Sequence, residues 1–381
     1  MSLFIDSITI KQRHPGRLDL ETGELVPTIP MVDEGVIGKF PRSDDTGEYC
    51  EDPEWAMQSR KKIRGSFDSL VIIKSDGFTV ELTGNIGRLD RCDNLFNLDF
   101  DATLQRCNEL LARYGLPPFT AGEQVINPNP SAHDVKHGLF EYWTGASISN
   151  IHLTRNYAAG SAANAQAVID WLATQSMSNV RRGRAGESTT QWGRKGGRKL
   201  LKAYIKHVEM LVHRHGRKRQ QVEADPVYQY CLQEGVVRLE LEAGRLLLRD
   251  NRLRFLGDIT MEKLTELFDD EVNPLIGRVK ADVTRLELDA LPAKVRMTAA
   301  AFLRGENVKT LLSTPTFYRH SKVLRDYGLD ISEPLPTLQK FASVIKVIEL
   351  KPLDSAPDWY WNHQRRMTLS AVPAEPAREA A

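Results

Sequence analysis

Cysteine is scarce in this chain of 381 residues, with only four copies. They lie far apart, and no two of them stand at the short separation that is typical of zinc ligands. The sequence therefore excludes a disulfide-stapled scaffold and offers no cysteine-based metal motif, and we expect reduced thiols in a cytoplasmic protein. The four residues are Cys50, Cys92, Cys107 and Cys231.

Long apolar runs are also missing. No stretch approaches the roughly 20 residues of a membrane-spanning helix, so the sequence predicts a protein without a membrane segment. The first ten residues include an apolar run, but Asp6 interrupts it and no basic region precedes it, so we interpret residues 3–10 as a first strand and not as a signal peptide. With 41% hydrophobic and 27% charged residues, the chain has the composition of a globular protein of two or three domains.

The net charge is only +1, but this value hides a strong asymmetry. Residues 181–219 contain 13 Lys or Arg residues and two acidic residues, a net charge of +11, so the rest of the chain carries −10. A solvated charged face is the plain alternative, but this excess is larger than solubility requires, and it favours binding to a nucleic acid. The side chains predicted to bind DNA are Arg181, Arg182, Arg184, Trp192, Arg194, Lys195, Arg198, Lys199, Lys202 and Arg238, with the Trp192 ring stacking on an exposed base.

The hydrophobic pattern predicts strands first and helices later. Residues 69–74 and 78–83 flank the turn Ser75-Asp76-Gly77 and are typical of a hairpin, and residues 100–114 have helical spacing. Strands are predicted at 151–157 and 236–242, with a helix at 162–174 between them, and most of the chain after residue 253 is predicted to be helical. We therefore predict an α+β protein with a largely antiparallel, nuclease-type sheet and a smaller, mainly helical C-terminal domain.

The sequence also predicts the structure of three further segments. Residues 176–199 are basic and rich in glycine, without an apolar face, and we expect a loop that becomes ordered on its ligand. The helices predicted at 307–312 and 316–327 match a helix-turn-helix, although ordinary helix packing gives the same pattern. A disordered tail is predicted from 362 to 381, where the sequence becomes rich in Pro, Ala and Glu after Ala371.

The stretch from Lys199 to Glu209 is the one around which the chemistry is organised. If it is a strand, Lys202, Tyr204 and Lys206 share one face, and Leu201, Ala203 and Ile205 face a core. A phenol oxygen between two ammonium groups can attack the phosphorus of a phosphodiester, because the cations hold the phosphate and favour ionisation of the phenol. The plain alternative is a half-buried surface pair on a strand.

Two other predicted strands carry polar side chains on one face. His152, Thr154 and Asn156 come from the first, and Arg238, Glu240 and Glu242 come from the second. If the three strands are neighbours, the face holds a nucleophile, a phosphate clamp and metal ligands, which suits metal-assisted transesterification of DNA. Outward polar residues are also what any half-exposed antiparallel sheet has, and periodicity does not establish which strands are adjacent.

The chain resembles the filamentous-phage replication initiation proteins of the gene II/X family. The likeness covers most of residues 1–361 and is strongest at 187–242, with weaker agreement in the Gly84–Phe96 loop. Two segments carry most of the resemblance, and their separation also matches the family: Glu187-Ser188-Thr189-Thr190-Gln191-Trp192 and Ala203-Tyr204-Ile205-Lys206-His207-Val208-Glu209. The other similar segments are Val237-Arg238-Leu239-Glu240, Thr316-Phe317-Tyr318-Arg319, Asp326-Tyr327-Gly328 and Pro357-Asp358-Trp359-Tyr360.

This resemblance implies a nicking and closing enzyme that acts on the double-stranded phage origin in the cytoplasm of a bacterial host. It places the nucleophile at Tyr204, with Lys206 as the phosphate clamp, and makes Glu240 the carboxylate ligand of Mg²⁺ or Mn²⁺. Contact with a host helicase and the replication machinery is a further expectation from the family.

One position departs from the family pattern. The family usually has an acidic residue where this chain has His152, in the run Asn150-Ile151-His152. Mg²⁺ prefers oxygen ligands and imidazole suits Mn²⁺ better, so His152 could ligate with a changed metal preference, Glu242 or Glu209 could supply the oxygen, or the site could be weakened.

The sequence thus predicts an origin-nicking catalytic domain over 1–250, which includes the basic segment 181–219, and a helical domain over 251–361. Two rival interpretations remain. The first is a non-enzymatic regulator that binds an origin or operator through the basic segment and the helices at 307–327, and the departure at His152 favours it. The second is an RNA-binding copy-control protein.

Overall fold

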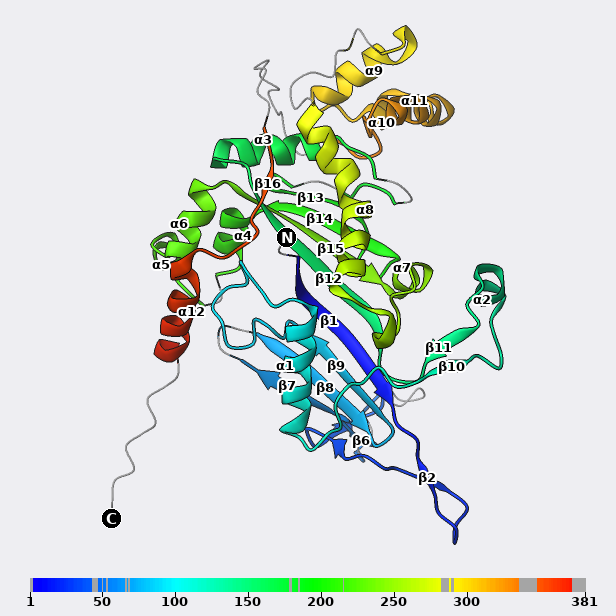
Figure 1. Cartoon of the computed structure of the whole chain (residues 1–381). Helices are drawn as coiled ribbons and strands as arrows, with labels where there is room; N and C mark the ends of the chain where they lie inside the picture. The colour runs from blue at the N-terminus through cyan, green and yellow to red at the C-terminus, as the bar shows by residue number, and fades with distance from the viewer. Residues whose placement is uncertain are drawn as a thin grey trace. The chain divides into compact units, whose positions relative to one another are not determined.

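The computed structural model confirms the α+β class. Most strands lie in the first part of the chain and most helices lie after residue 160 (Figure 1). Within the described residues, no helix combines the length and the apolar character that crossing a bilayer requires. The structure describes residues 3–42, 47–49, 51–52, 54–65, 67, 69–177, 180–183, 186–214, 216–281, 288, 291–335 and 348–371.

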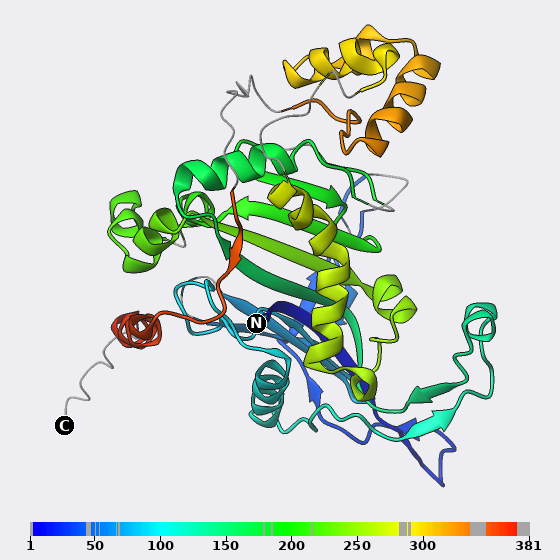
Figure 2. The same cartoon turned by 45° about the horizontal axis from the view of Figure 1, so that its top comes forward.

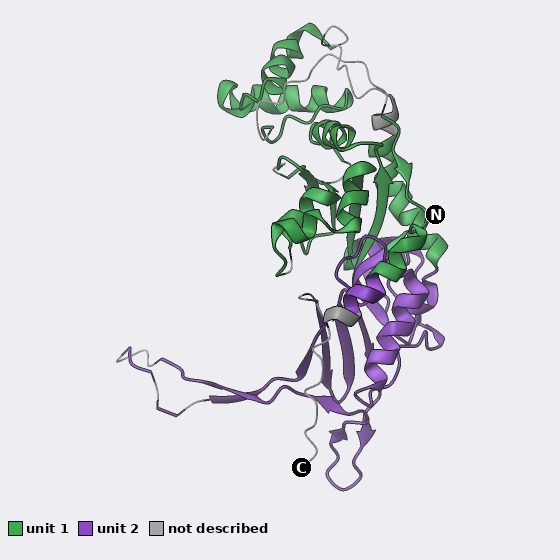
Figure 3. Cartoon of the chain, turned by 90° about the vertical axis from the view of Figure 1, so that its left-hand side faces the viewer, with its two compact units in different colours: residues 1–4, 152–247, 261–363 green, residues 5–151, 248–260, 364–381 purple. Residues whose placement is uncertain are grey.

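Two compact units make up the chain, and each is assembled from separate stretches of sequence (Figure 3). The predicted division into consecutive domains over 1–250 and 251–361 stays a prediction. Unit 1 comprises residues 1–4, 152–247 and 261–363, and unit 2 comprises residues 5–151, 248–260 and 364–381.

Unit 2 contains a run of antiparallel strands in the order β1, β9, β8 and β4, and β7 also pairs with β8. Three two-stranded ribbons join β2 to β3, β5 to β6 and β10 to β11. The bounds are β1 Phe4–Arg13, β2 Arg17–Leu18, β3 Leu25–Val26, β4 Met31–Val32, β5 Val36–Lys39, β6 Glu54–Met57, β7 Arg60–Arg64, β8 Leu70–Asp76, β9 Thr79–Gly84, β10 Gln124–Ile126 and β11 Glu141–Trp143.

The predicted hairpin is confirmed by β8 and β9. Alternate side chains such as Val71 and Ile73 are buried, as the period of two requires. Asp76 closes the turn, because its carboxylate accepts backbone hydrogen bonds from Phe78 and Thr79 at 2.9 and 2.7 Å. The hairpin therefore forms where the sequence supplies both an alternating pattern and a turn-closing acid.

Helix α1 (Phe100–Ala112) confirms the helix predicted from residue 100. Its N-cap Asp99 accepts a hydrogen bond from the backbone nitrogen of Ala102, and Cys107 and Leu110 lie on its buried face. The cap and the apolar spacing together explain why a helix begins at this point of the chain. Unit 2 also contains α2 (Ala132–His137) and a short helix η1 (Leu256–Asp258).

The cysteines that the structure describes are free thiols. Cys92, Cys107 and Cys231 are all buried, and Cys50 lies outside the described residues. Burial raises the pKa of the Cys107 thiol to about 12, so this thiol stays protonated and unreactive at neutral pH. None of these three residues forms a disulfide bond in the part of the chain that the structure describes.

In unit 1 the strands follow the order β13, β14, β15 and β12, and β16 pairs with β12. β13 and β15 both pair with β14 in antiparallel register, so β14 is an interior strand and β13 is the edge of the sheet that the structure describes. The bounds are β12 Ser147–Ala158, β13 Thr189–Gly193, β14 Lys199–Ile205, β15 Val236–Gly244 and β16 Lys351–Pro352.

Helices α3 and α8 lie on one face of these strands (Figures 1 and 2). Two cations on that face are paired with α8. Arg155 on β12 forms an ion pair of 2.6 Å with Asp269, and Lys199 on β14 pairs with Glu271. The polar side chains that the sequence singled out lie on the opposite face of the strands. Helices α3 and α8 therefore do not cover them.

A separate apolar core forms around α9, α10 and α11. Its residues include Val295, Phe302, Phe317 and Leu324. The helices predicted near 299–327 are confirmed, whereas a helix-turn-helix role stays a prediction.

The helices after residue 160 have the following bounds: α3 Ala162–Leu172, α4 Lys206–Val212, α5 Arg219–Glu223, α6 Pro226–Gln233, α7 Arg245–Asp250, α8 Met261–Ala281, α9 Ala293–Leu303, α10 Val308–Leu311, α11 Thr314–Asp326 and α12 Asp358–Ala371.

Two segments differ from the sequence prediction. Residues 189–193, expected in a loop, form strand β13, because Thr190 and Trp192 alternate with half-buried neighbours and are fully buried. Residues 362–371, expected in a disordered tail, continue α12. There the Thr368 hydroxyl donates to the Asp90 carbonyl at 2.6 Å. The rest of the predicted tail lies outside the described residues.

Candidate functional site

The polar face of unit 1 is assembled by the register of two strands. On β14 and β15, Lys202 is paired with Glu240 and Tyr204 is paired with Arg238. β12 follows β15 in the strand order and brings His152 to the same place. The three strands are therefore neighbours, which the sequence alone did not establish.

Glu240 is the centre of this group. Its Oε1 lies 3.0 Å from His152 Nδ1 and 3.4 Å from Lys202 Nζ, and its Oε2 accepts a hydrogen bond from the Tyr204 hydroxyl at 3.4 Å. Burial raises the pKa of the Glu240 carboxyl, but the hydrogen bond with His152 and the charges of Lys202 and Arg238 outweigh it and lower the pKa to about 2. The carboxylate is thus ionised and tied to the hydroxyl that the sequence proposed as the nucleophile.

The imidazole of His152 lies between two carboxylates. Nδ1 faces Glu240, and Nε2 lies 3.8 Å from Oε2 of Glu242. The other oxygen of Glu242 accepts a hydrogen bond from the backbone nitrogen of Gly196 at 3.2 Å. Glu240 and Glu242 are both 6% exposed, so these are buried acids and not surface charges.

Such a donor set fits a divalent cation. Two carboxylates and one imidazole are ligands that Mn²⁺ accepts, and the carboxylate oxygens also suit Mg²⁺. Buried carboxylates require a cation or hydrogen-bond donors, and His152 and Lys202 now meet that need for Glu240. A metal ion would therefore take over contacts that these two side chains already make.

Lys206 is not a residue of the strand that carries Tyr204, contrary to the sequence prediction. β14 ends at Ile205, and Lys206 is the first residue of α4. Its side chain is 2% exposed and its Nζ lies 2.8 Å from Glu209 Oε2. Burial raises the pKa of Glu209, but the Lys206 ammonium outweighs this effect and keeps the pKa below its usual range. A helix begins here because apolar residues recur at every second position up to Tyr204 and at every third or fourth position after it.

Arg238 is also wrongly predicted as a DNA contact. It is fully buried, its Nε donates to Asn156 Oδ1 at 2.8 Å, and its guanidinium lies 5.3 Å from the centre of the Phe4 ring. The alternating pattern of β15 correctly predicted the face on which Arg238 lies, but it did not predict that the side chain is buried. Here a buried cation balances the acidic groups of the same face.

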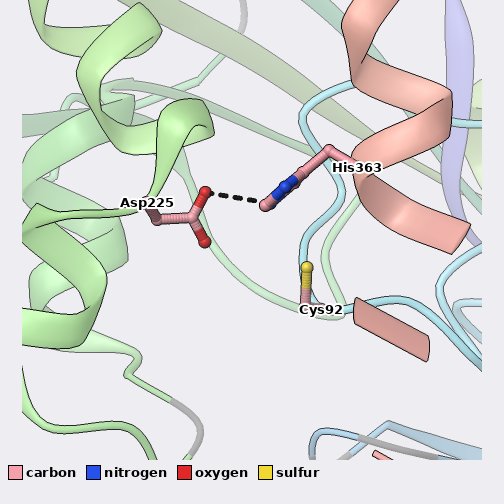
Figure 4. A group of neighbouring side chains, drawn as sticks. All are labelled: Cys92, Asp225 and His363. Atoms are coloured by element: carbon pink, nitrogen blue, oxygen red, sulfur yellow. Dashed lines mark ion pairs between the residues drawn. The ribbon is translucent and has the colours of Figure 1, made fainter. Parts of the chain in front are cut away.

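Another imidazole and carboxylate pair lies in unit 1, outside the Tyr204 group. His363 Nε2 lies 3.2 Å from Asp225 Oδ1 (Figure 4). Asp225 also caps α6, where it accepts a hydrogen bond from the backbone nitrogen of Val227, and it forms an ion pair of 2.6 Å with Arg217. These contacts commit Asp225 to holding α6, so the Tyr204 group remains the candidate site.

Comparison with known protein families decides the relationship of the chain. The model of the N-terminal region of the phage replication-associated proteins matches residues 55–262, which is more than half of the chain. The chain belongs to the phage replication-associated protein family. The model of the C-terminal region of the same family matches residues 288–365. The family predicted from the sequence motifs is thereby confirmed, and Tyr204, Glu240 and His152 all lie within the N-terminal match.

Two phage proteins and one solved structure are similar to this member of the replication-associated protein family. The replication-associated protein of Escherichia phage If1 is 28% identical over 321 residues, which cover 76% of this chain and 97% of that protein. The protein of the same name from Enterobacteria phage I2-2 is 28% identical over 206 residues, which cover 51% and 58%. A rolling circle replication initiator protein from Geobacillus stearothermophilus covers 79% of this chain and 84% of that chain, with 10% identity and a TM-score of 0.25.

The basic segment of this replication-associated protein divides into buried and exposed cations. Arg182 is 1% exposed and donates hydrogen bonds to the backbone carbonyls of Asp330 and Glu333. Arg184 lies outside the described residues. Of the other cations that were predicted to bind DNA, Arg181, Arg194, Lys195 and Arg198 are exposed, Lys202 is half-buried and Lys199 is buried.

Trp192 cannot stack on a base in this fold. Its ring is fully buried, and its indole nitrogen donates to the backbone carbonyl of Gln175 at 2.8 Å. The alternation of Thr190 and Trp192 on an edge strand was the signal in the sequence that could have shown this. The sequence reasoning also missed the hydrogen bond from the Gly196 backbone to Glu242, for which no sequence signal exists because it depends on the β13–β14 turn.

Proposed function

We propose that this protein starts rolling-circle replication of a phage genome by nicking and resealing one strand of double-stranded origin DNA. The observation that carries the proposal is the Tyr204 hydroxyl, which lies 3.4 Å from the buried Glu240 carboxylate in a member of the replication-associated protein family. A phenol held against an ionised carboxylate, beside an ammonium group and an imidazole, is the chemistry that phosphoryl transfer to tyrosine requires.

Tyr204 acts as the nucleophile. Its phenol oxygen gives up its proton to solvent and forms a bond to phosphorus, one phosphoester bond of the DNA breaks, and the released deoxyribose oxygen takes up a proton. The DNA end stays attached as a phosphotyrosine, and resealing reverses the exchange, so no ATP is consumed. Glu240 orients the hydroxyl, because a carboxylate with so low a pKa is a poor proton acceptor.

The neighbouring groups have separate roles. Lys202 is half-buried beside Glu240 and is placed to meet the negative charge that develops on the phosphate oxygens. Glu240, Glu242 and His152 would hold Mg²⁺ or Mn²⁺, and such an ion supplies electrostatic stabilisation of the phosphate charge. Lys206 acts through Glu209, so its role is to position α4 and not to clamp the phosphate.

DNA is held through its phosphates by the exposed cations of the basic segment, chiefly Arg194, Lys195 and Arg198. A host helicase and other replication proteins are partners that the family relationship favours. The rival function is a regulator that binds the origin without cutting it. The departure at His152 favours this alternative, since an imidazole replaces an oxygen ligand there.

The test is nicking of a supercoiled plasmid that bears the presumed origin, with Mg²⁺ or Mn²⁺. We expect the native protein to convert the plasmid to open circles and to remain covalently attached to DNA, and Tyr204→Phe to do neither, because it lacks only the attacking oxygen. Tyr157→Phe is the matched control. Tyr157 is buried, and burial raises its pKa, so this variant should nick normally.

Three other outcomes would change the proposal. Equal nicking by the native protein and Tyr204→Phe would remove Tyr204 as the nucleophile. Loss of nicking in both variants would indicate that the sheet does not tolerate the changes. A native protein that shifts the mobility of the plasmid but never nicks it, with either metal, would support the regulator.

A further inference from the structure

A basic groove runs along unit 1 outside the Tyr204 group. It consists of two cavities, of about 340 Å³ and 530 Å³, that share Val180 and Arg181 as lining residues. The first cavity lies between residues Ser176, Met177, Val180 and Arg181 on one side and helices α10 and α11 on the other. The second is lined by the turns at the ends of β13 and β14, which carry Arg194 and Arg198.

Helices α10 and α11 supply one wall of the first cavity. Phe317 and Leu324 belong to the apolar core around α9, α10 and α11, and the residues that follow them in sequence, Tyr318 and Arg325, are exposed. Tyr318 is 58% exposed and packs edge-on against Phe317, with the two ring centres 5.5 Å apart. Arg325 lies two turns further along α11 and also lines the cavity. This wall therefore presents an aromatic ring and a cation on one helical face.

Further cations and a hydroxyl complete the lining. Arg181 is exposed and lines both cavities, and Lys309 from α10 lies with its Nζ 5.8 Å from the centre of the Phe317 ring. Ser332 also lines the first cavity, and its Oγ is buried without a hydrogen-bond partner among the described residues. A buried hydroxyl without a partner is an available donor for an anionic oxygen.

The acids of the groove do not cancel this charge. Asp330 is buried, and its carboxylate accepts a hydrogen bond from the backbone nitrogen of Ser332 at 2.9 Å. Glu333 and Asp330 both lie beside the buried guanidinium of Arg182, whose pKa is lowered by burial and raised in turn by these two acids. The exposed charges that face solvent along the groove are therefore predominantly positive.

We propose that this groove binds single-stranded DNA, with Tyr318 stacking on an unpaired base and Arg181, Lys309 and Arg325 contacting phosphates. An exposed aromatic ring among cations is the combination that single strands require. A cavity of about 340 Å³ is at the small end of ligand sites, a size that suits a single unpaired base better than a duplex. The proposal rests on the proposed function only because it takes DNA as the substrate. It places the unpaired strand near the nick against helix α11.

The experiment measures binding of a fluorescein-labelled oligothymidylate of about 12 nucleotides by fluorescence anisotropy, in EDTA so that no cleavage occurs. Tyr318→Ala should weaken binding about 5- to 150-fold, which is the usual effect of losing one stacked base. Tyr318→Trp should restore it. Tyr327→Ala is the matched control, because Tyr327 is 45% exposed at the end of the same helix but does not line the groove, and it should bind as the native protein does.

Salt dependence tests the phosphate contacts separately. Arg325→Ala should reduce the slope of log K against log salt concentration by about 0.7, the value for one phosphate contact on a single strand. Arg319→Ala, an exposed cation one residue from Tyr318 that does not line the groove, should leave the slope unchanged. A hairpin duplex should bind the native protein and Tyr318→Ala equally.

The results separate this inference from the proposed function. Native affinity of Tyr318→Ala for the oligothymidylate, or an equal loss in Tyr327→Ala, would overturn the inference whether or not the protein nicks DNA. An equal loss of duplex binding in Tyr318→Ala would also overturn it, since the groove would then hold both strands. A protein that never nicks the plasmid but binds the oligothymidylate through Tyr318 would refute the enzyme and leave the groove assignment intact.

Discussion

Arg181 and Arg182 are adjacent in the chain but lie in opposite environments. Arg181 is exposed in the basic groove, whereas Arg182 is buried, donates to two backbone carbonyls and lies 6.0 Å from the centre of the Phe302 ring. Truncation of Arg182 would leave those carbonyls unpaired in the interior, so its cost is to stability. Substitution of a whole cluster of arginines would therefore mix a loss of DNA binding with a loss of folding.

His152 is the residue at which metal preference should change. Replacing it with Asp adds oxygen donors beside Glu240 and Glu242 and removes the imidazole that suits Mn²⁺. We expect His152→Asp to shift the ratio of nicking rates with Mg²⁺ and Mn²⁺ toward Mg²⁺ by about tenfold or more. The measurement is the initial nicking rate with each metal.

His213→Asp is the control for this change, because His213 is exposed on the segment after α4. It should keep the native ratio. An unchanged ratio in His152→Asp would show that residue 152 does not contact the metal.

At the scale of an element, the β8–β9 hairpin owes its turn to one carboxylate. Partial burial raises the pKa of Asp76, but backbone hydrogen bonds from Phe78 and Thr79 outweigh it and lower the pKa below the usual value. A carboxyl group whose pKa is lowered by folding adds stability above its unfolded pKa of about 4, and this stability is lost as the pH falls through the folded value.

Asp76→Ala should therefore lower the free energy of unfolding at pH 7 by about 1 kcal/mol or less, since the carboxylate is exposed and solvent screens it. The deficit should begin to shrink below a pH of about 4, where the carboxyl of the unfolded chain becomes protonated, and it should vanish as the pH falls through the lower pKa of the folded protein. Urea unfolding at neutral pH and at a pH of about 3 measures both values. Asp76→Asn keeps an acceptor and should lose less at neutral pH, and a deficit for Asp76→Ala that is equal at both pH values would contradict the assignment.

Strand β13 shows how an element can escape sequence patterns. Its five residues lie within a basic stretch rich in glycine, and only Thr190 and Trp192 mark a buried face. The strand exists because β14 offers an edge, and pairing with that edge satisfies the backbone groups of residues 189–193. Such an element depends on a neighbour and not on its own propensity.

For the whole molecule, the charge asymmetry makes a prediction about DNA binding. Replacing Arg194, Lys195 and Arg198 together with Ala should reduce the slope of log K against log salt concentration, for origin duplex, by up to about 2.7, because each phosphate contact contributes about 0.9. Filter binding of a labelled origin fragment at several salt concentrations gives the slope.

The control replaces three exposed cations outside residues 181–219, namely Arg64, Arg113 and Lys136. It changes the net charge by the same amount and should leave the slope close to the native value. Equal slopes for the two triple variants would mean that overall charge, and not the basic segment, sets the affinity.

Much of the fold and of the site could be predicted from the sequence where the signal is local. The hairpin at 70–84 and helix α1 carry their own turn and cap residues, and the alternation along β14 and β15 gave the correct face for Tyr204 and Glu240. The failures concern Lys206 and four predicted DNA contacts that are buried, namely Arg182, Trp192, Lys199 and Arg238. For these residues the end of a strand or the depth of burial is decided by elements distant in sequence.

The sequence by itself determined the family, the α+β class and the concentration of positive charge, because motifs, periodicity and composition are properties of the chain alone. Only the tertiary structure decided that His152 lies between Glu240 and Glu242, that Arg182 is buried beside an exposed Arg181, and that α11 lines the same cavity as Arg181. The physical reason is that burial, ion pairing and cavities depend on which strands and helices become neighbours, and that is fixed by packing of the whole core.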